Sequence, residues 1–123
     1  MGTRCVIAEY KENERVVGSY CHYDGYIGHT GSTLMECYNT PELASQIANI
    51  GYASFLYKTY DETKEESVHK NEIPMGFDSV EEFLKEGGDC GAEYLYLWDG
   101  EAWFVSHLYS DDHRFEALEN FTA

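Results

Sequence analysis

The sequence predicts a single α+β domain with two antiparallel β-hairpins, at about 3–23 and 92–109, and three to four short helices. Two observations lead to this prediction. Runs rich in β-branched and aromatic residues flank a polar turn near each end of the chain, and helix-capping signals with apolar residues at helical spacing lie between them. At 123 residues, without an internal repeat or a linker, the chain 1–123 fits one hydrophobic core.

The first hairpin joins two β-prone runs on either side of the polar segment 11–15. If the turn is centred on Asn13, the two-residue period of strands decides which side chains face one another. The expected cross-strand pairs are Arg4 with His22, Val6 with Tyr20 and Tyr10 with Val16 on one face, and Cys5 with Cys21 on the other. A slip of one residue in the turn would break every pair.

Two consecutive short helices are predicted within 32–50. Thr33 and Glu36 have the spacing of a capping box, which places the start of the first helix at residue 32 or 33. Thr40 then serves as the N-cap of the second helix, and Pro41 takes the first helical position, where its missing amide donor costs nothing.

Three further segments are interpreted from composition and spacing. The aromatic segment 52–60 is either a strand or an irregular buried segment, because its periodicity does not decide between them. The segment 61–74 is predicted to be a charged surface loop. The tail, 113–121, is predicted to be a final helix from three apolar residues at helical spacing, namely Phe115, Leu118 and Phe121.

A fourth helix and the second hairpin complete the prediction. Ser79 and Glu82 form a capping box for a helix over 79–86. Asp99-Gly100 is a turn pair that tolerates positive φ, and it lies between two aromatic strands. Leu95 and Leu97 are expected on one face, with Tyr94, Tyr96 and Trp98 on the other. The aromatic group Tyr94, Tyr96, Trp98, Trp103 and Phe104 forms either one face of the core or an exposed recognition platform.

Charge is the most unusual property of the sequence, since the net charge is −15. Residues 61–123 hold 17 acidic and four basic residues, so most of the negative charge lies in the second half. Such a surface repels nucleic acid and anionic lipid and attracts basic proteins. The carboxylates of a candidate partner-binding face are Asp61, Glu62, Glu65, Glu66, Glu72, Asp78, Glu81, Glu82, Glu86 and Asp89. This face either imitates the phosphates of DNA or serves only solubility.

Polar residues of the first hairpin form a second candidate site. His22 and Asp24 share one strand face by parity, and the predicted register adds Arg4 to them. Together with Tyr26 they form either a small-ligand pocket or a polar network that braces the hairpin against the glycine-rich loop 24–31.

The sequence contains no motif for catalysis, and we expect no catalytic residue, no cofactor and no metal. Cys21 and His22 are neighbours on a strand, so their side chains point to opposite faces. The four cysteines include no C-x-x-C pair and the five histidines no H-x-x-x-H pair. No stretch reaches the roughly 20 apolar residues of a membrane span. We expect a cytoplasmic protein whose cysteines are reduced and mostly buried.

Three parts of the region 3–40 carry a resemblance to other proteins. They are Thr3-Arg4-Cys5, Tyr20-Cys21-His22-Tyr23-Asp24-Gly25-Tyr26, and Gly31 with Leu34 and Tyr38. In these parts the chain resembles a group of short bacteriophage and prophage proteins of uncharacterised function. Those proteins often have Gly-Tyr-Pro after the aspartate, where this chain has Gly25-Tyr26-Ile27. The resemblance supplies no catalytic residue.

The resemblance implies a phage accessory protein that acts in the cytoplasm of a bacterial host. Small acidic phage proteins commonly inhibit host defence, as anti-CRISPR and anti-restriction proteins that occupy a DNA-binding surface. We therefore expect an inhibitor that binds a basic, nucleic-acid-binding surface of a host defence protein through its acidic face. The alternative is a protein that binds and sequesters a nucleotide signal in a pocket near Arg4, His22 and Tyr26.

Overall fold

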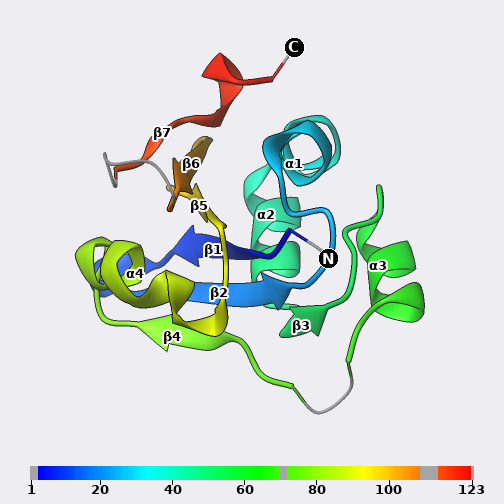
Figure 1. Ribbon diagram of the computed structural model, residues 1–123, viewed down its shortest axis with the longest axis horizontal. Helices are drawn as coiled ribbons and strands as arrows, with labels where there is room; N and C mark the ends of the chain where they lie inside the picture. The colour runs from blue at the N-terminus through cyan, green and yellow to red at the C-terminus, as the bar shows by residue number, and fades with distance from the viewer. Residues whose placement is uncertain (1–2, 70–71, 109–113, 123) are drawn as a thin grey trace.

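A seven-stranded mixed β-sheet forms the middle layer of the computed structural model, which describes residues 3–69, 72–108 and 114–122 (Figure 1). The main strand order is β3-β2-β1-β5-β6-β7, and β4 also pairs with β2. The strands are β1 Cys5–Tyr10, β2 Val16–Cys21, β3 Tyr52–Ala53, β4 Met75–Phe77, β5 Tyr94–Trp98, β6 Trp103–His107 and β7 Glu116–Ala117. With the helices, this sheet gives the α+β fold that the sequence predicts.

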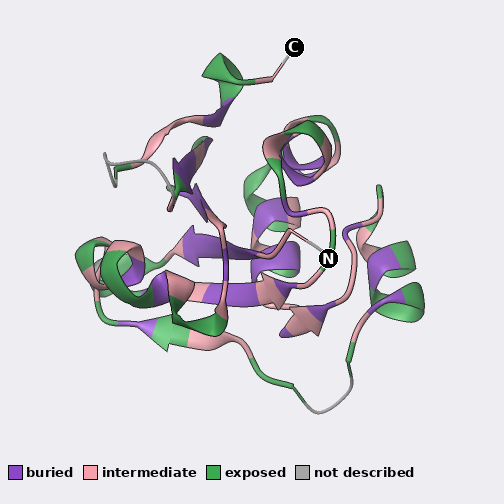
Figure 2. Ribbon diagram, viewed as in Figure 1, coloured by how far each residue is buried: buried purple, intermediate pink, exposed green. Residues whose placement is uncertain are grey.

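Helices cover both faces of the sheet. The α-helices are α1 Ser32–Cys37, α2 Pro41–Ala48, α3 Tyr60–Glu66 and α4 Val80–Glu86, and the single turns are η1 Glu12–Glu14, η2 Ile27–Gly31, η3 Gly87–Cys90 and η4 Leu118–Asn120. α1 and α2 pack on one face through Leu34 and Ile47, and α4 packs on the other through Phe83. Figure 2 shows the buried residues in the sheet and on the inward sides of the helices. No helix among the described residues is long and apolar enough to cross a bilayer.

The first hairpin has the predicted register. The observed pairs include Val6 with Tyr20, Tyr10 with Val16 and Cys5 with Cys21. Asn13, in η1, has a positive φ of 68°, a conformation that asparagine adopts more easily than most residues. Arg4 and His22 lie just beyond the last paired residues, so the paired strands are shorter than 3–23.

A parallel pair of strands joins the two hairpins in the centre of the sheet. β1 pairs with β5 from Cys5 opposite Tyr94 to Glu9 opposite Trp98. The sequence analysis did not predict this contact, because no local pattern specifies which strands of different hairpins become neighbours.

The second hairpin has a wider turn than predicted. Trp98 lies opposite Trp103, so the turn takes residues 99–102 and not only Asp99-Gly100. The Asp99 carboxylate closes it by accepting hydrogen bonds from the amides of Glu101 and Ala102, both at 2.8 Å. As predicted, Leu95 and Leu97 face one cluster and Tyr94, Tyr96 and Trp98 the other. Residue 109, the predicted end of this hairpin, lies outside the described residues.

The two consecutive helices form where predicted, although the first has a different start. The Thr40 hydroxyl caps α2 by accepting a first-turn amide at 3.2 Å, and Pro41 occupies the first position. α1 begins at Ser32, but its N-cap is the preceding glycine and the predicted capping box of Thr33 and Glu36 is wrong. The π-helical turn η2 runs directly into α1 and leaves Thr33 buried within the helix.

The helix predicted over 79–86 is confirmed as α4. Its N-cap is Ser79, whose hydroxyl accepts the amide of Glu82 at 3.0 Å. The Glu82 carboxylate in turn accepts the amide of Asp78, one residue before the expected partner.

The predicted surface loop over 61–74 is wrong, because its first part forms α3. The Thr59 hydroxyl caps this helix by accepting the amide of Glu62 at 3.1 Å. The fully buried residue of α3 is Thr63, which hydrogen-bonds to the amide of Tyr57 at 3.0 Å. A helix that is held by polar contacts of this kind has no apolar stripe. Its sequence therefore lacks the apolar residues at helical spacing from which a helix is predicted.

The predicted final helix over 113–121 is also wrong. Residue 113 lies outside the described residues, and residues 114 and 115 are not helical and are followed by β7 and η4. Phe115 packs against the cluster under α4, whereas Leu118 is buried in the cluster on the other face and Phe121 is 48% exposed. The three apolar residues therefore lie in three different environments and do not share one helix face.

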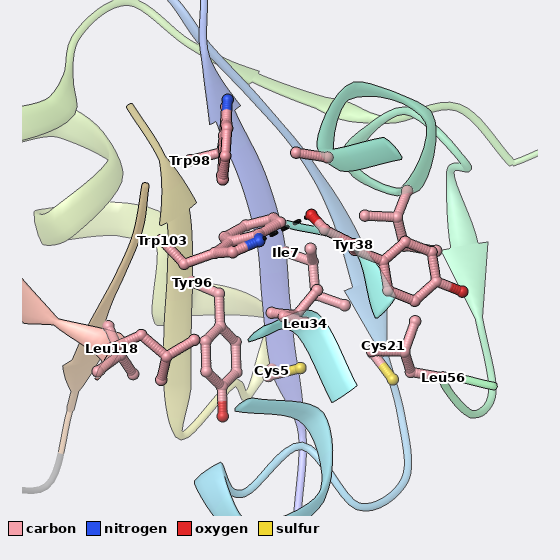
Figure 3. Close-up of a cluster of buried hydrophobic side chains, with 13 residues drawn as sticks. Cys5, Ile7, Cys21, Leu34, Tyr38, Leu56, Tyr96, Trp98, Trp103 and Leu118 are labelled. Atoms are coloured by element: carbon pink, nitrogen blue, oxygen red, sulfur yellow. Dashed lines mark hydrogen bonds between the residues drawn. The ribbon is translucent and has the colours of Figure 1, made fainter. Parts of the chain in front are cut away.

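Tyr38 connects three distant parts of the fold from within the core (Figure 3). Its side chain is fully buried, and its phenol donates a hydrogen bond to the carbonyl of Tyr57 at 2.7 Å and lies 3.2 Å from the hydroxyl of Thr63. Its carbonyl accepts the indole N–H of Trp103 at 3.0 Å. Because burial disfavours the charged phenolate, it raises the pKa of Tyr38 to about 12.

We expect Tyr38→Phe to lower the free energy of unfolding by about 1 kcal/mol at neutral pH, since the buried partners lose the phenol. This deficit should shrink above pH 10, because the phenol ionises near pH 10 in the unfolded chain but near pH 12 in the folded one. One pH unit of this difference is worth about 1.4 kcal/mol, so the two proteins should be equally stable near about pH 11. Urea unfolding at a series of pH values measures the effect.

Tyr23→Phe is the matched control, because the Tyr23 side chain is 48% exposed and its loss should change stability little at any pH. A Tyr38→Phe deficit that stays constant above pH 10 would show that the phenol does not hold its proton in the folded state.

Candidate functional site

The backbone of the segment 20–26 is anchored on the neighbouring strand. The His22 amide donates a hydrogen bond to the carbonyl of Ala53 at 3.1 Å, and the Tyr23 amide donates to the carbonyl of Ser54 at 2.8 Å. These bonds continue the parallel pairing of β2 with β3 beyond the end of the ladder. Backbone hydrogen bonds therefore fix the conformation of this segment at His22 and Tyr23.

The Asp24-Gly25 turn packs closely against the start of β1. Asp24 has a φ of 56°, which favours a short polar residue or glycine. The Gly25 amide donates to the carbonyl of Thr3 at 2.7 Å, and its carbonyl accepts the phenol of Tyr96 at 2.7 Å. A Cβ on Gly25 would lie 2.8 Å from the Cβ of Cys5, so only glycine fits. The main chain here braces the hairpin against the loop.

Arg4 and His22 both lie beside Tyr20. The Tyr20 hydroxyl is 2.8 Å from Nδ1 of His22. Burial raises the pKa of Tyr20, and the guanidinium of Arg4 opposes that rise. The same guanidinium covers Gly91, where an added Cβ would lie 2.8 Å from Nη1. The neighbouring Cys90 is exposed as a residue, but partial burial of its thiol raises the pKa, against a smaller opposing effect of Arg4.

The four residues of the predicted pocket do not form one hydrogen-bonded group. Within 3–69, 72–108 and 114–122, no hydrogen bond or ion pair joins the side chain of Asp24 or Tyr26 to Arg4. Tyr26 is 43% exposed and belongs to an aromatic group with His29 and Phe55. Arg4 and His22 are therefore associated through Tyr20, and Tyr26 lies with different neighbours.

A cleft of about 300 Å³ opens beside Tyr20, on the face of the sheet that carries α4. It is lined by Tyr20, Gly51, Tyr52, Glu72, Ile73, Met75 and Cys90. None of the four predicted pocket residues lines it, although Arg4 lies beside two lining residues, Tyr20 and Cys90. This cleft could not be predicted from the sequence, because its walls come from four segments far apart in the chain.

The ten candidate carboxylates are all exposed or half-buried, but they form two groups. The α3 group is Asp61, Glu62, Glu65 and Glu66, and the α4 group is Asp78, Glu81, Glu82, Glu86 and Asp89. α3 and α4 lie at opposite ends of the long axis of the molecule in Figure 1, and Glu72 lies on the connection between them. A single flat partner would contact one group and not both.

The α4 group is the more crowded electrostatically. The pKa of Glu86 is raised by a hydrogen bond with Glu82 and by the negative charge of Glu82, which lies one helical turn away. Asp89 adds to the shift, and the opposing effect of Lys85 is smaller. No basic side chain in the described part of the chain forms an ion pair with either glutamate. The end of the molecule at α4 therefore carries an excess of negative charge that Lys85 offsets only in part.

The aromatic hairpin belongs to the core. Tyr96, Trp98 and Trp103 are buried in the cluster shown in Figure 3, whereas Tyr94 and Phe104 are half-buried. The interpretation as a core face is confirmed for the three buried rings.

Cysteine and histidine side chains are dispersed over the described residues. Cys5 and Cys21 are buried, Cys37 is half-buried and Cys90 is exposed, so the expectation of mostly buried thiols is wrong for Cys90. Within the ranges that the structure describes, no group of three or more His, Cys, Asp or Glu side chains is arranged to hold a metal ion.

Gly91→Ala should destabilise the fold by about 1–2 kcal/mol, because φ is +94° there and the new Cβ displaces Arg4. Since Arg4 lowers the pKa of Tyr20, its displacement should raise that pKa further. Unfolding in urea and an NMR titration of the Tyr20 ring carbons measure the two effects.

Gly100→Ala separates the backbone effect from the loss of Arg4. Its φ is +109°, but nothing lies within 4 Å of the added Cβ. Gly100→Ala should lower the free energy of unfolding by a similar amount and leave the pKa of Tyr20 unchanged. Equal Tyr20 pKa values in both variants would mean that Arg4 does not act on this phenol.

Glu82→Gln should lower the pKa of Glu86 toward its usual range, since Glu82 is the main cause of its rise. Glutamine keeps an oxygen acceptor for the Asp78 amide, so the helix cap should survive. Carboxyl-carbon NMR titration measures the pKa. Glu62→Gln on α3 is the control, and it should leave Glu86 unaffected.

Comparison with known proteins gives no match. No family model, no curated protein and no solved structure matches this chain. The contacts, charges and cleft described above are therefore the basis for a proposed function.

Proposed function

We propose that this protein is a phage-type inhibitor that binds a basic, nucleic-acid-binding surface of a host defence protein, and that the α4 group makes the contact. The observation that carries the proposal is the grouping of exposed and half-buried carboxylates at α4, where Glu82 and Glu86 form no ion pair with a described basic side chain. Glu82 raises the pKa of Glu86 by a hydrogen bond and by its negative charge, and the smaller opposing effect of Lys85 leaves part of this charge without a counter-charge. A basic partner would supply that counter-charge.

The geometry of α4 favours imitation of a phosphate backbone. Glu82 and Glu86 lie one helical turn apart on α4, a short helix that is capped at Ser79 and packed on the sheet through Phe83, and Asp78 and Asp89 lie just beyond its two ends. Duplex DNA presents one charge per roughly 1.7 Å of axis, and proteins that bind it use Lys and Arg clusters. A fixed row of carboxylates meets such clusters without a large loss of conformational entropy.

The test compares two variants with equal loss of charge. Glu81, Glu82 and Glu86 are changed to Gln in the α4 variant, and Glu62, Glu65 and Glu66 in the α3 variant. Partners are isolated by passing the heparin-binding fraction of a bacterial lysate over the immobilised protein. The dissociation constant is then measured for each variant over a series of salt concentrations.

We expect the α4 variant to bind at least about tenfold more weakly, with a reduced salt dependence, and the α3 variant to bind within about twofold of the unmodified protein. Duplex DNA should compete with binding. Both variants should unfold thermally as the unmodified protein does, because exposed charges contribute little to stability. Equal weakening by both variants would mean that only net charge matters, and the docking role of α4 would then be rejected.

A further inference from the structure

We propose that the cleft beside Tyr20 and Tyr52 is a binding site for a small planar aromatic molecule that carries an anionic group. The ring would lie in the cleft, and the anion would extend past Tyr20 and Cys90 to the guanidinium of Arg4, which lies beside these two lining residues. This inference does not rest on the proposed function, since it concerns a different part of the surface.

The walls of the cleft fit a single ring system. Tyr20 and Tyr52 pack edge to face with their ring centroids 5.0 Å apart, and Ile73 and Met75 add aliphatic walls. Its volume of about 300 Å³ lies at the lower end of small-molecule sites, which span about 300–1,000 Å³. A flat ring can pack against such a surface, because aromatic rings bury a large area with few internal degrees of freedom.

The rim of the cleft includes an apolar side chain in water. Ile73 is 81% exposed, although it is large and hydrophobic. A molecule in the cleft would cover part of this side chain and remove it from water, which favours binding by about 25 cal/mol for each Å² covered.

Arg4 supplies the second part of the site. The chain has 23 acidic residues, yet no described carboxylate lies within 4.0 Å of the Arg4 guanidinium. Arg4 is half-buried and held over Gly91, beside Tyr20 and Cys90 of the cleft wall. A partly desolvated guanidinium without a carboxylate is a strong site for a ligand carboxylate or phosphate, to which it can donate two parallel hydrogen bonds.

Glu72 makes the proposal more specific. It lines the cleft and is exposed, so its negative charge opposes an anionic ligand. Removal of that charge should therefore strengthen the binding of a ring that carries an anion, and should leave an uncharged ring unaffected.

Three probes separate the contributions of the ring and the anion. Phenyl phosphate carries both, phenol carries the ring alone, and inorganic phosphate carries the anion alone. Methyl-labelled methionine provides the signals, because Met75 lines the cleft whereas Met35 lies on α1, away from it. We expect phenyl phosphate to shift the Met75 signal saturably without shifting Met35, and phenol and phosphate each to bind at least about tenfold more weakly.

Variants test the two charged residues. Arg4→Gln should abolish the preference for phenyl phosphate over phenol. Arg15→Gln, an exposed arginine beside Gly76 at the far end of β2, should preserve it. Glu72→Gln should tighten the binding of phenyl phosphate and leave the binding of phenol unchanged. If Arg4→Gln does not fold, the three probes on the unmodified protein and on Glu72→Gln still decide the question.

The proposal is overturned if phenyl phosphate gives no saturable Met75 shift at millimolar concentration, or if phenol binds as tightly. It is also overturned if a folded Arg4→Gln variant keeps the preference. These outcomes leave the proposed function of α4 untouched, because no basic protein takes part in the measurement.

Discussion

The placement of helices over the sheet depends on the buried polar contacts of Tyr38. A phenol in the core is tolerated only with partners, since an unsatisfied buried polar group costs about 1–3 kcal/mol. Its partners belong to the segment before α3, to α3 itself and to β6. A shift of α1 would therefore break contacts in three places at once. This constraint fixes α3, whose own buried residue is the polar Thr63.

The face of the sheet opposite α1 and α2 carries both proposed interaction sites. Phe83 anchors α4 there and Met75 packs in the same cluster, so the acidic end and the cleft share one supporting core. η3 connects them directly, because it runs from the end of α4 to Cys90 in the cleft wall. The glycine at 91 then leaves room for Arg4. A substitution that weakens the packing of α4 would therefore alter both the α4 group and the cleft.

Local signals were enough to predict the elements whose determinants are close in sequence. The turn at Asn13, the cap at Thr40 and the cap at Ser79 each depend on neighbours within a few residues. α3 has the same kind of cap at Thr59, but it lacks the apolar spacing from which a helix is predicted. The cleft and the position of Arg4 follow from the packing of segments that are remote in sequence, and no local pattern encodes them.

The parallel contact between β1 and β5 has a consequence for the order in which the chain acquires structure. On the ribosome, β1 and β2 can pair as soon as both have emerged, but the other edge of β1 stays unpaired until residues 94–98 are synthesised. During that interval the nascent chain exposes an apolar strand edge, which is a template for pairing with other chains. Pairing of β5 with β1 ends this exposure, so the parallel contact also removes an edge at which the chain could aggregate.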